Sequence, residues 1–337
     1  MHHMPKTIAI VTPVLDDWAS FTALMREIAG LLAGCGAALH VYAVDDGSSE
    51  PFEPAAEILT PHSCIASIEM IRLAANLGHQ RAIAVGLCAV VEDDTADAVL
   101  VMDSDGQDRP ADIGALLVAG ARHPQHVVVA ARAKRHEPGA FRLWYWLYRL
   151  LFRALTGQAI NFGNFCLIPM TAARRLVHMP ELWNNLAAAV MRSRLPYMSV
   201  ATVRGTRSCG DSKMNLPGLI VHGLSAMSVY SDVIFVRMLL AAGGIAVLAA
   251  LGIISVAVTR MATTLAVPGW ATTAAGDLMI ILLQTFVVAI AASLTMLAGR
   301  SSRPLVPIHD CAAFVAQRES RRRHPLRPVI SLARPVA

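Results

Sequence analysis

Short apolar runs alternate with helical stretches between residue 6 and about residue 205. Helical stretches at about 18–33, 79–92 and 111–122 separate most of the runs. Alternation of this kind predicts an α/β domain, with a mainly parallel sheet that helices cover on both faces. We place this domain at residues 6–213. The runs of strand length are 8–11, 39–44, 65–71, 98–102 and 127–131.

Two longer apolar segments follow this domain. Residues 238–258 and 278–299 contain no Asp, Glu, Lys or Arg, and about 20 apolar helical residues cross about 30 Å of hydrocarbon. The sequence therefore predicts a transmembrane hairpin over residues 237–299, with a pair of buried core helices as the alternative. The connection at 259–277 has one basic residue, Arg260, whereas eight arginines follow residue 299. By the positive-inside rule, we expect both chain ends in the cytoplasm.

Residues 140–156 have an amphipathic pattern. On a helical wheel Arg142, Arg149 and Arg153 share one face, and Trp144 lies opposite with three leucines. A cationic face opposite a Trp/Leu face predicts a helix in the membrane interface. A helix that packs on its own domain is the alternative. Residues 214–236 are predicted to form a second interfacial helix that leads into the first span.

The composition agrees with a membrane-attached protein. Hydrophobic residues make up 55% of the 337 residues, charged residues 16%, and the mean hydropathy is +0.50, whereas soluble domains carry about 25% charged residues. These values exclude a disordered chain, a collagen and a disulfide scaffold. The net charge is +5, and after residue 299 eight arginines against Asp310 and Glu319 give +6. We therefore expect residues 300–337 to form an Arg-rich cytoplasmic tail that faces anionic lipid rather than nucleic acid.

Polar side chains follow three of the predicted strands, where ligands bind in sheets of this kind. Pro13 follows the first strand, residues 45–48 end the second, and residues 103–105 follow the fourth. The two carboxylates of residues 103 and 105 suit a hard divalent cation, and Gln107 offers a neutral oxygen to the same site. A loop that caps a helix near Pro110 is the alternative. Two acidic loops at one sheet edge favour a site for a cation and a nucleotide.

The motifs occur in the order and spacing found in one family. They are Val11-Thr12-Pro13, Val44-Asp45-Asp46-Gly47-Ser48, Asn76-Leu77-Gly78-His79-Gln80, Met102-Asp103-Ser104-Asp105-Gly106-Gln107-Asp108, Phe162-Gly163-Asn164-Phe165 and the segment from Arg207 through Gly210, Ser212 and Lys213 to Met214. With two membrane spans after them, the chain resembles family 2 glycosyltransferases of GT-A fold. The resemblance is to the polyprenol-phosphate branch, which includes enzymes like dolichol-phosphate-mannose synthase and the bactoprenol-phosphate glycosyltransferases. It covers residues 6 to about 300.

The resemblance implies a role for residues in each motif. The base and ribose of a nucleotide sugar are expected at Pro13, Asp17, Val44 and Asp46. The diphosphate and its Mg²⁺ or Mn²⁺ are expected at Asp103, Ser104, Asp105 and Gln107, and the metal ligands among these are Asp103, Asp105 and Gln107. The segment that closes on the diphosphate contributes Arg207, Ser212 and Lys213. The acceptor phosphate is expected at Arg132 and, as a looser match, Arg142. The catalytic residues implied are Asp105, Arg132, Arg207 and Lys213.

The resemblance also implies the reaction and its location. A sugar would move with inversion from a nucleotide sugar, a UDP-sugar rather than GDP-mannose, to undecaprenyl or another polyprenyl phosphate. A lipid phosphate is already ionised at pH 7, because its second pKa is about 6, and needs no general base. The enzyme would be a multi-pass protein of the inner membrane with its catalytic domain in the cytoplasm, and the resemblance allows a homo-oligomer.

Several positions depart from the family's pattern. Ala75 replaces a frequent arginine, whose contact is either missing or moved to Arg72. Leu15 replaces an aromatic residue. A serine for the acceptor phosphate has no counterpart, because Tyr145 and Trp146 occupy that region.

Asn164 replaces an acidic residue, and this bears on the alternatives. A family 2 transferase with a hydroxyl acceptor would need a base near Gly163 and Asn164, where none is evident. A catalytically silent membrane adaptor of the same fold is the other alternative. It would be favoured by loss of the acidic or basic positions implied above, and these are intact.

Overall fold

The computed structural model describes residues 4–33, 36–50, 59, 63–132, 139–159, 162–207, 216–262 and 269–322, except the side chains of 132, 139–145, 147–148, 216–220 and 222. The chain forms two units. The first contains residues 1–138, 160–229 and 305–337, and the second contains residues 139–159 and 230–304.

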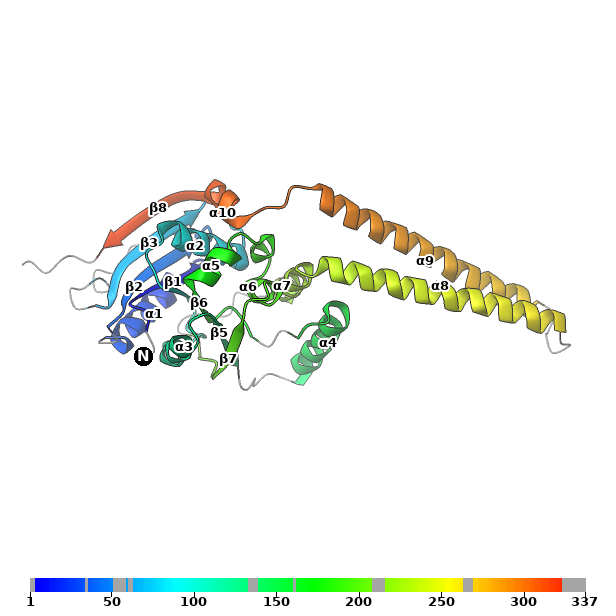
Figure 1. Ribbon diagram of the computed structural model, residues 1–337, viewed down its shortest axis with the longest axis horizontal. Coiled ribbons are helices and arrows are strands. Elements are labelled where there is room, and N and C mark those ends of the chain that lie inside the picture. Colours follow the sequence, from blue (N-terminus) through cyan, green and yellow to red (C-terminus); the bar gives the residue numbers. More distant parts are fainter. Residues whose placement is uncertain are drawn as a thin grey trace, which may run out of the picture. The chain divides into compact units, whose positions relative to one another are not determined.

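One eight-stranded sheet organises the first unit (Figure 1). Its strand order is β7-β5-β6-β4-β1-β2-β3-β8. The pairs β1–β2, β1–β4, β2–β3 and β5–β7 are parallel. β6 is antiparallel to both β4 and β5, so β4 and β5 run in the same direction. The strands are β1 (Thr7–Val14), β2 (Ala38–Asp45), β3 (Ile65–Leu73), β4 (Ala98–Val101), β5 (Val127–Arg132), β6 (Cys166–Pro169), β7 (Tyr197–Thr202) and β8 (Val315–Arg322).

Helices cover both faces of this sheet because its central strands are apolar on both faces. On β1, Ile8 and Ile10 pack against α1 (Trp18–Leu31) and α3 (Ile113–Arg122), whereas Ala9 and Val11 face the other layer. The predicted α/β class is confirmed. The other layer consists of α2 (His79–Asp93), α5 (Met170–Leu176) and α6 (Leu186–Arg192), and short 3₁₀ turns lie at Pro110–Asp112, Pro180–Trp183 and Cys311–Phe314.

Helix α2 packs very closely on the sheet at Gly86. A Cβ atom on this residue would lie 2.5 Å from Cγ1 of Val11 and 3.0 Å from Cγ2 of Val44. Any side chain here would have to displace β-branched residues of two central strands. The close contact fixes the distance between α2 and the sheet. α2 begins at His79, beyond the carboxyl end of β3.

The chain returns to the sheet after the second apolar helix. After α10 (Pro307–Asp310), β8 adds antiparallel to the free edge of β3. Arg318 on β8 pairs with Glu69 on β3 at 2.6 Å and also with Asp93 at the end of α2. The prediction that residues 300–337 form a separate tail therefore needs correction for 305–322, because the open edge of β3 offers backbone hydrogen bonds to any extended segment. Residues 323–337 lie outside the described part.

The second unit contains α4 (Gly139–Thr156), α8 (Ser231–Ala262) and α9 (Trp270–Ser301). The two predicted spans lie within α8 and α9, and both helices are long and apolar enough to cross a membrane. α4 occupies the segment predicted to be an interfacial helix, and Trp146 on it is 59% exposed.

Where one interfacial helix was expected at 214–236, the structure has two helices. α7 (Leu216–Ser228) ends and α8 begins at Ser231. The hydroxyl of Ser228 donates to the carbonyl of Ser225 at 2.8 Å in the last turn of α7. Serine bonds of this kind compete with the helical ladder and favour helix ends.

The end of α4 is bonded to α8. Arg237 on α8 donates from Nη1 to the carbonyl oxygen of Ala154 at 2.5 Å. The ring of Phe152 meets that of Tyr230 edge to face, with centroids 6.2 Å apart. Gly157 ends the helix with φ +76°, and a Cβ there would lie 2.6 Å from Nη2 of Arg237. Helix C-termini favour a cation near their last carbonyl groups.

Candidate active site

The acidic loops predicted to bind ligand meet at one edge of the sheet. In the parallel register Pro13 at the end of β1 pairs with Val44 near the end of β2. β4 runs parallel to β1, and Asp103 follows it by two residues. Val44 is fully buried, so it contributes to the floor of this edge rather than to its surface.

Asp46 binds the turn that precedes α2. Its carboxylate accepts from the backbone N–H of Leu77 at 2.7 Å and of Gly78 at 3.0 Å. Burial raises the pKa of Asp46, and these two N–H groups act against the rise. Gly47 makes the approach possible, because it has φ +82° and a Cβ would lie 3.0 Å from the nitrogen of Asn76. Asp46 thereby fixes the position of the α2 N-terminus.

The neighbouring Asp45 shapes its own loop. Its carboxylate accepts from the N–H of Ser48 at 2.7 Å and lies 3.7 Å from Nε of Arg72. Arg72 also donates to the carbonyl oxygen of Ser48 at 3.4 Å. Arg72 thus contacts the loop of Asp45; that it takes over the contact that Ala75 cannot make stays a prediction.

Asp103 and Asp105 lie in a loop that its own side chains hold in shape. The N–H of Asp103 donates to the carboxylate of Asp108 at 3.0 Å, and the N–H of Gln107 donates to that of Asp105 at 3.0 Å. Asp108 is 3% exposed, and the sequence analysis gave it no role. Burial raises the pKa of Asp105, and the nearby carboxylate of Asp103 raises it further. The backbone N–H of Gln107 and the guanidinium groups of Arg207 and Arg204 act against this rise in pKa.

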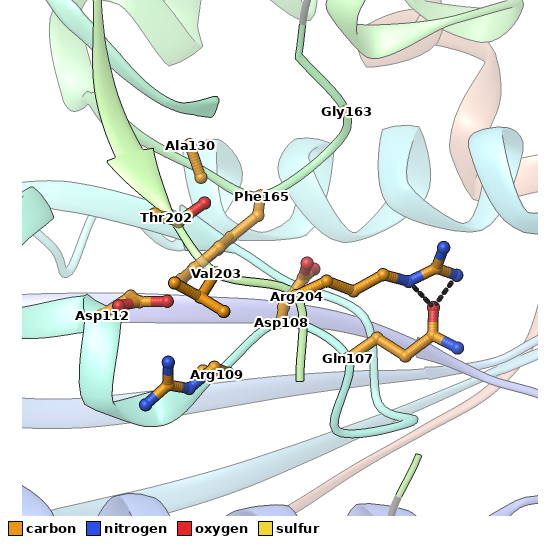
Figure 2. Close-up of a pocket in the computed structure, with 10 residues that line it drawn as sticks. All are labelled: Gln107, Asp108, Arg109, Asp112, Ala130, Gly163, Phe165, Thr202, Val203 and Arg204. Atoms are coloured by element: carbon orange, nitrogen blue, oxygen red, sulfur yellow. Dashed lines mark hydrogen bonds between the residues drawn. The ribbon is translucent and has the colours of Figure 1, made fainter. Parts of the chain in front are cut away.

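Gln107 is engaged by an arginine. Its Oε1 accepts from Nε of Arg204 at 3.1 Å and from Nη2 at 2.5 Å (Figure 2). Both residues line a cavity of about 10 Å³ that also reaches Thr202 and Phe165, which is room for about one water molecule. This cavity is too small for a sugar.

Arg207 contacts carboxylates from two loops. Its Nη2 lies 2.6 Å from Oδ2 of Asp17, and its Nη1 lies 3.8 Å from Oδ2 of Asp105. The three side chains are only 14–21% exposed. The structure thus brings together a residue expected at the nucleotide, one expected at the cation and one expected at the diphosphate.

A chain of side-chain amides reaches Asp103 from the other side. The backbone N–H of Leu186 donates to Oε1 of Gln80 at 2.8 Å, which leaves the Gln80 amide nitrogen to donate to Oδ1 of Asn164 at 2.9 Å. The Asn164 amide nitrogen lies 2.8 Å from Nε2 of His79, and that ring nitrogen lies 3.2 Å from Oδ1 of Asp103.

His79 and Gln80 thus belong to the site, although the sequence analysis assigned them no role. Burial acts to lower the pKa of His79, but the carboxylates of Asp103, Asp108 and Asp46 together outweigh it and raise the pKa above its usual value. Both His79 and Gln80 belong to the motif that starts at Asn76, and this was the feature of the sequence that could have indicated a role for them.

A model of the glycosyl transferase family 2 domain matches residues 10–182. The chain belongs to this family. Curated relatives include undecaprenyl-phosphate 4-deoxy-4-formamido-L-arabinose transferases from Sodalis glossinidius and from Salmonella paratyphi A. The first is 27% identical over 224 residues, which are 63% of this chain and 64% of the relative. The second is 26% identical over 223 residues, 64% of each chain. The chain thus spans about 64% of the length of these relatives.

Solved structures of two glycosyl-3-phosphoglycerate synthases are also similar. Mannosyl-3-phosphoglycerate synthase from Rubrobacter xylanophilus has a TM-score of 0.46 and 15% identity, covering 67% of this chain and 73% of that one. Glucosyl-3-phosphoglycerate synthase from Mycobacterium tuberculosis, in complex with Mn²⁺, UDP-glucose and phosphoglyceric acid, has a TM-score of 0.45 and 16% identity, covering 69% and 79%. The predicted family is confirmed by the domain match, and with it the GT-A class.

The residues of this family 2 site fit a hard divalent cation. Asp103 and Asp105 supply two carboxylates on one loop, and Mg²⁺ commonly binds one or two carboxylates while it keeps waters and contacts substrate phosphates. Within the described residues, no three His, Cys, Asp or Glu side chains converge as a metal cage. Waters, phosphate oxygens or a neutral oxygen such as that of Gln107 would therefore have to complete the coordination.

The other predicted residues are described less fully. Arg132 ends β5, where it pairs with Thr202, and β5 runs parallel to β4, so its backbone lies at the same sheet edge as Asp103. Ser104 is buried in the acidic loop. Arg142 lies on α4 with its side chain outside the description, and Ser212 and Lys213 lie outside the described residues.

Proposed function

We propose that this family 2 protein transfers a sugar from a nucleotide sugar to a polyprenyl phosphate at the cytoplasmic face of the inner membrane. A UDP-sugar is the donor we favour. The lipid phosphate attacks the anomeric carbon in line, the bond from that carbon to the diphosphate breaks, and the configuration inverts. Mg²⁺ or Mn²⁺, held by Asp103 and Asp105, would offset charge on the departing nucleoside diphosphate.

The observation that carries this proposal is the contact of Arg207 with Asp17, which follows β1, and with Asp105 in the loop after β4. Arg207 lies 2.6 Å from Asp17 and 3.8 Å from Asp105, so a cationic group is already present between the carboxylates of the nucleotide and cation positions. Guanidinium groups bind diphosphate oxygens with two parallel hydrogen bonds. On donor binding Arg207 is therefore suited to exchange a carboxylate for the diphosphate.

Position 164 supports a phosphate acceptor. A hydroxyl acceptor needs a base to remove its proton, whereas a phosphate monoester is already ionised at pH 7. Asn164 is an amide, and its oxygen and nitrogen are both engaged, with Gln80 and His79. Arg132 at the end of β5 is the residue we assign to the attacking phosphate.

The apolar helices and the relatives support a lipid acceptor. α8 and α9 have the length and hydropathy of membrane spans, and the curated relatives are named for undecaprenyl phosphate.

A paired measurement on Arg132→Ala tests the proposal. Purified protein is incubated with undecaprenyl phosphate and a panel of labelled UDP- and GDP-sugars, and the affinity for the accepted donor is measured separately. A charged hydrogen bond is worth about 1.5–3 kcal/mol, so transfer should fall about ten- to a hundredfold while donor affinity changes little. Arg122→Ala, at the end of α3, is the control and should leave both values unchanged.

Two outcomes would contradict this assignment. Loss of donor affinity together with transfer would make Arg132 a donor-site residue. Transfer of sugar to a hydroxyl acceptor, with none to the lipid phosphate, would overturn the proposed reaction.

A further inference from the structure

Arg204 binds the side-chain oxygen of Gln107, the neutral oxygen that is expected to contact the cation. The guanidinium donates to Oε1 of Gln107 from Nε at 3.1 Å and from Nη2 at 2.5 Å, as the dashed lines in Figure 2 show. Gln107 is the third residue expected to bind the cation, after Asp103 and Asp105. In this arrangement its oxygen points to a cationic side chain instead.

The backbone keeps Arg204 in this place. The N–H of Gly205 donates to the carbonyl oxygen of Gln107 at 2.9 Å. A Cβ on Gly205 would lie 2.5 Å from the carbonyl oxygen of Gly106, so only glycine allows the two segments to come this close. Arg204 thus follows β7 by two residues and is anchored on its other side by Gly205.

Arg204 and a cation therefore compete for the same oxygen. An amide oxygen that accepts two N–H bonds from a guanidinium has both lone pairs in use, and a positive charge beside it repels a metal ion. Cation binding without nucleotide should consequently be weaker than the three oxygen ligands would allow.

A nucleoside diphosphate could remove this competition. Diphosphate oxygens bind a guanidinium fork better than a neutral amide does, because the hydrogen bonds are then charge-assisted on both sides. Arg204 is exposed, so a nucleotide can reach its side chain from solvent.

We propose that Arg204 is a positioning residue that withholds Gln107 from the cation until a nucleoside diphosphate draws the guanidinium away. Binding of the cation and of the nucleotide is then positively coupled, since each makes the other's ligand available. The coupling deepens the function proposed above and rests on it for the identity of the nucleotide ligand. It assigns a role to a residue outside the motif that starts at Arg207.

The test measures Mn²⁺ affinity by electron paramagnetic resonance of the free ion, with and without UDP, and needs no turnover. Without UDP, Arg204→Gln should bind Mn²⁺ about fivefold more tightly than the wild type, because exposed charged contacts are worth up to about 1 kcal/mol. The factor by which UDP raises the Mn²⁺ affinity should then be about fivefold smaller in the variant than in the wild type.

Three further variants separate the effect of the Arg204–Gln107 hydrogen bond from the effect of losing a positive charge. They are Gln107→Ala, Gln107→Ala combined with Arg204→Gln, and Arg109→Gln. In a Gln107→Ala background, Arg204→Gln should change Mn²⁺ affinity less than about twofold. Arg109→Gln removes an equal charge from the wall of the same cavity, where Figure 2 shows the Arg109 side chain away from Gln107. It should leave the coupling with UDP unchanged. Thermal unfolding of each variant verifies that it is folded.

The proposal is overturned if Arg204→Gln leaves Mn²⁺ affinity unchanged, or if its effect is equal with and without Gln107. An equal loss of coupling in Arg109→Gln would also overturn it. These measurements of Mn²⁺ affinity do not involve the acceptor of the sugar. Absence of sugar transfer to undecaprenyl phosphate, with the Mn²⁺ and UDP cycle intact, would refute the proposed function and leave the role of Arg204 standing.

Discussion

Replacing Arg207 by glutamine should slow transfer strongly, because it removes one positive charge from the centre of the site. The Nη2 atom lies 2.6 Å from Asp17, and Nη1 lies 3.8 Å from Asp105. At 3.8 Å two unit charges interact by about 1 kcal/mol in a water-like medium and about 4 kcal/mol at an effective dielectric constant of 20. The site lies between these limits, because its side chains are 14–21% exposed.

The size of the effect follows from the charge that develops on the leaving group. A charged hydrogen bond contributes about 1.5–3 kcal/mol, so Arg207→Gln should lower kcat about ten- to a hundredfold. A double-mutant cycle with Asp17→Asn measures the pair. Because the two side chains are in contact, the loss in the double variant should be smaller than the sum of the single losses by about 1 kcal/mol or more.

The control is Arg174→Gln. Arg174 forms a surface ion pair with Asp94 at 2.5 Å, and the two side chains are 50% and 59% exposed. An exposed pair contributes about 0–1 kcal/mol to stability, so kcat should not change. If Arg207→Gln retained full kcat, or if its loss and that of Asp17→Asn were additive, Arg207 would not act with Asp17 on the donor.

Three further predictions concern packing and topology. Gly86→Ala should lower the free energy of unfolding by about 1–3 kcal/mol, because the new methyl group would lie 2.5 Å from Cγ1 of Val11. An unchanged melting temperature in detergent would contradict the close contact of α2 with the sheet. Arg318→Ala should lower the free energy of unfolding by about 1 kcal/mol, since it removes the two ion pairs that Arg318 makes with Glu69 and Asp93. Salt at about 0.5 M should destabilise the wild type in the same direction. Reporter tags at residues 1 and 337 should be cytoplasmic and one within 263–268 should be outside; tags at the two termini on opposite sides would exclude the hairpin.

Much of the sheet could be predicted because local patterns encode it. The five apolar runs became β1 to β5, since strands buried on both faces need continuous apolar residues. β6 and β7 were not predicted: Cys166–Pro169 has only four residues, and Tyr197–Thr202 is an alternating, half-exposed strand. β8 is exposed along nearly its whole length, so no hydrophobic signal marks it.

The candidate site was predictable where chemistry follows a strand directly. Asp46, Asp103 and Asp105 end or follow strands, and the order of the motifs indicated their family. No role was predicted for Asp108, because it accepts a hydrogen bond from the backbone N–H of Asp103. This contact depends on the fold of the loop. Asn164 could be named as a departure from the family, but not as the partner of His79, which is 85 residues away.

The sequence by itself determined the α/β class, the two apolar helices and the identity of the acidic loops, because these depend on periodicity, segment length and residue type. Only the tertiary structure decided that residues 315–322 close the sheet and that Arg204 binds Gln107, 97 positions away. Both depend on contacts between distant segments. In β8 the contacts are backbone hydrogen bonds, which any residue except proline can make. Between Arg204 and Gln107 the contacts join two types of side chain that are common on protein surfaces. The pairing of β8 with β3 and that of Arg204 with Gln107 therefore leave no pattern in the sequence.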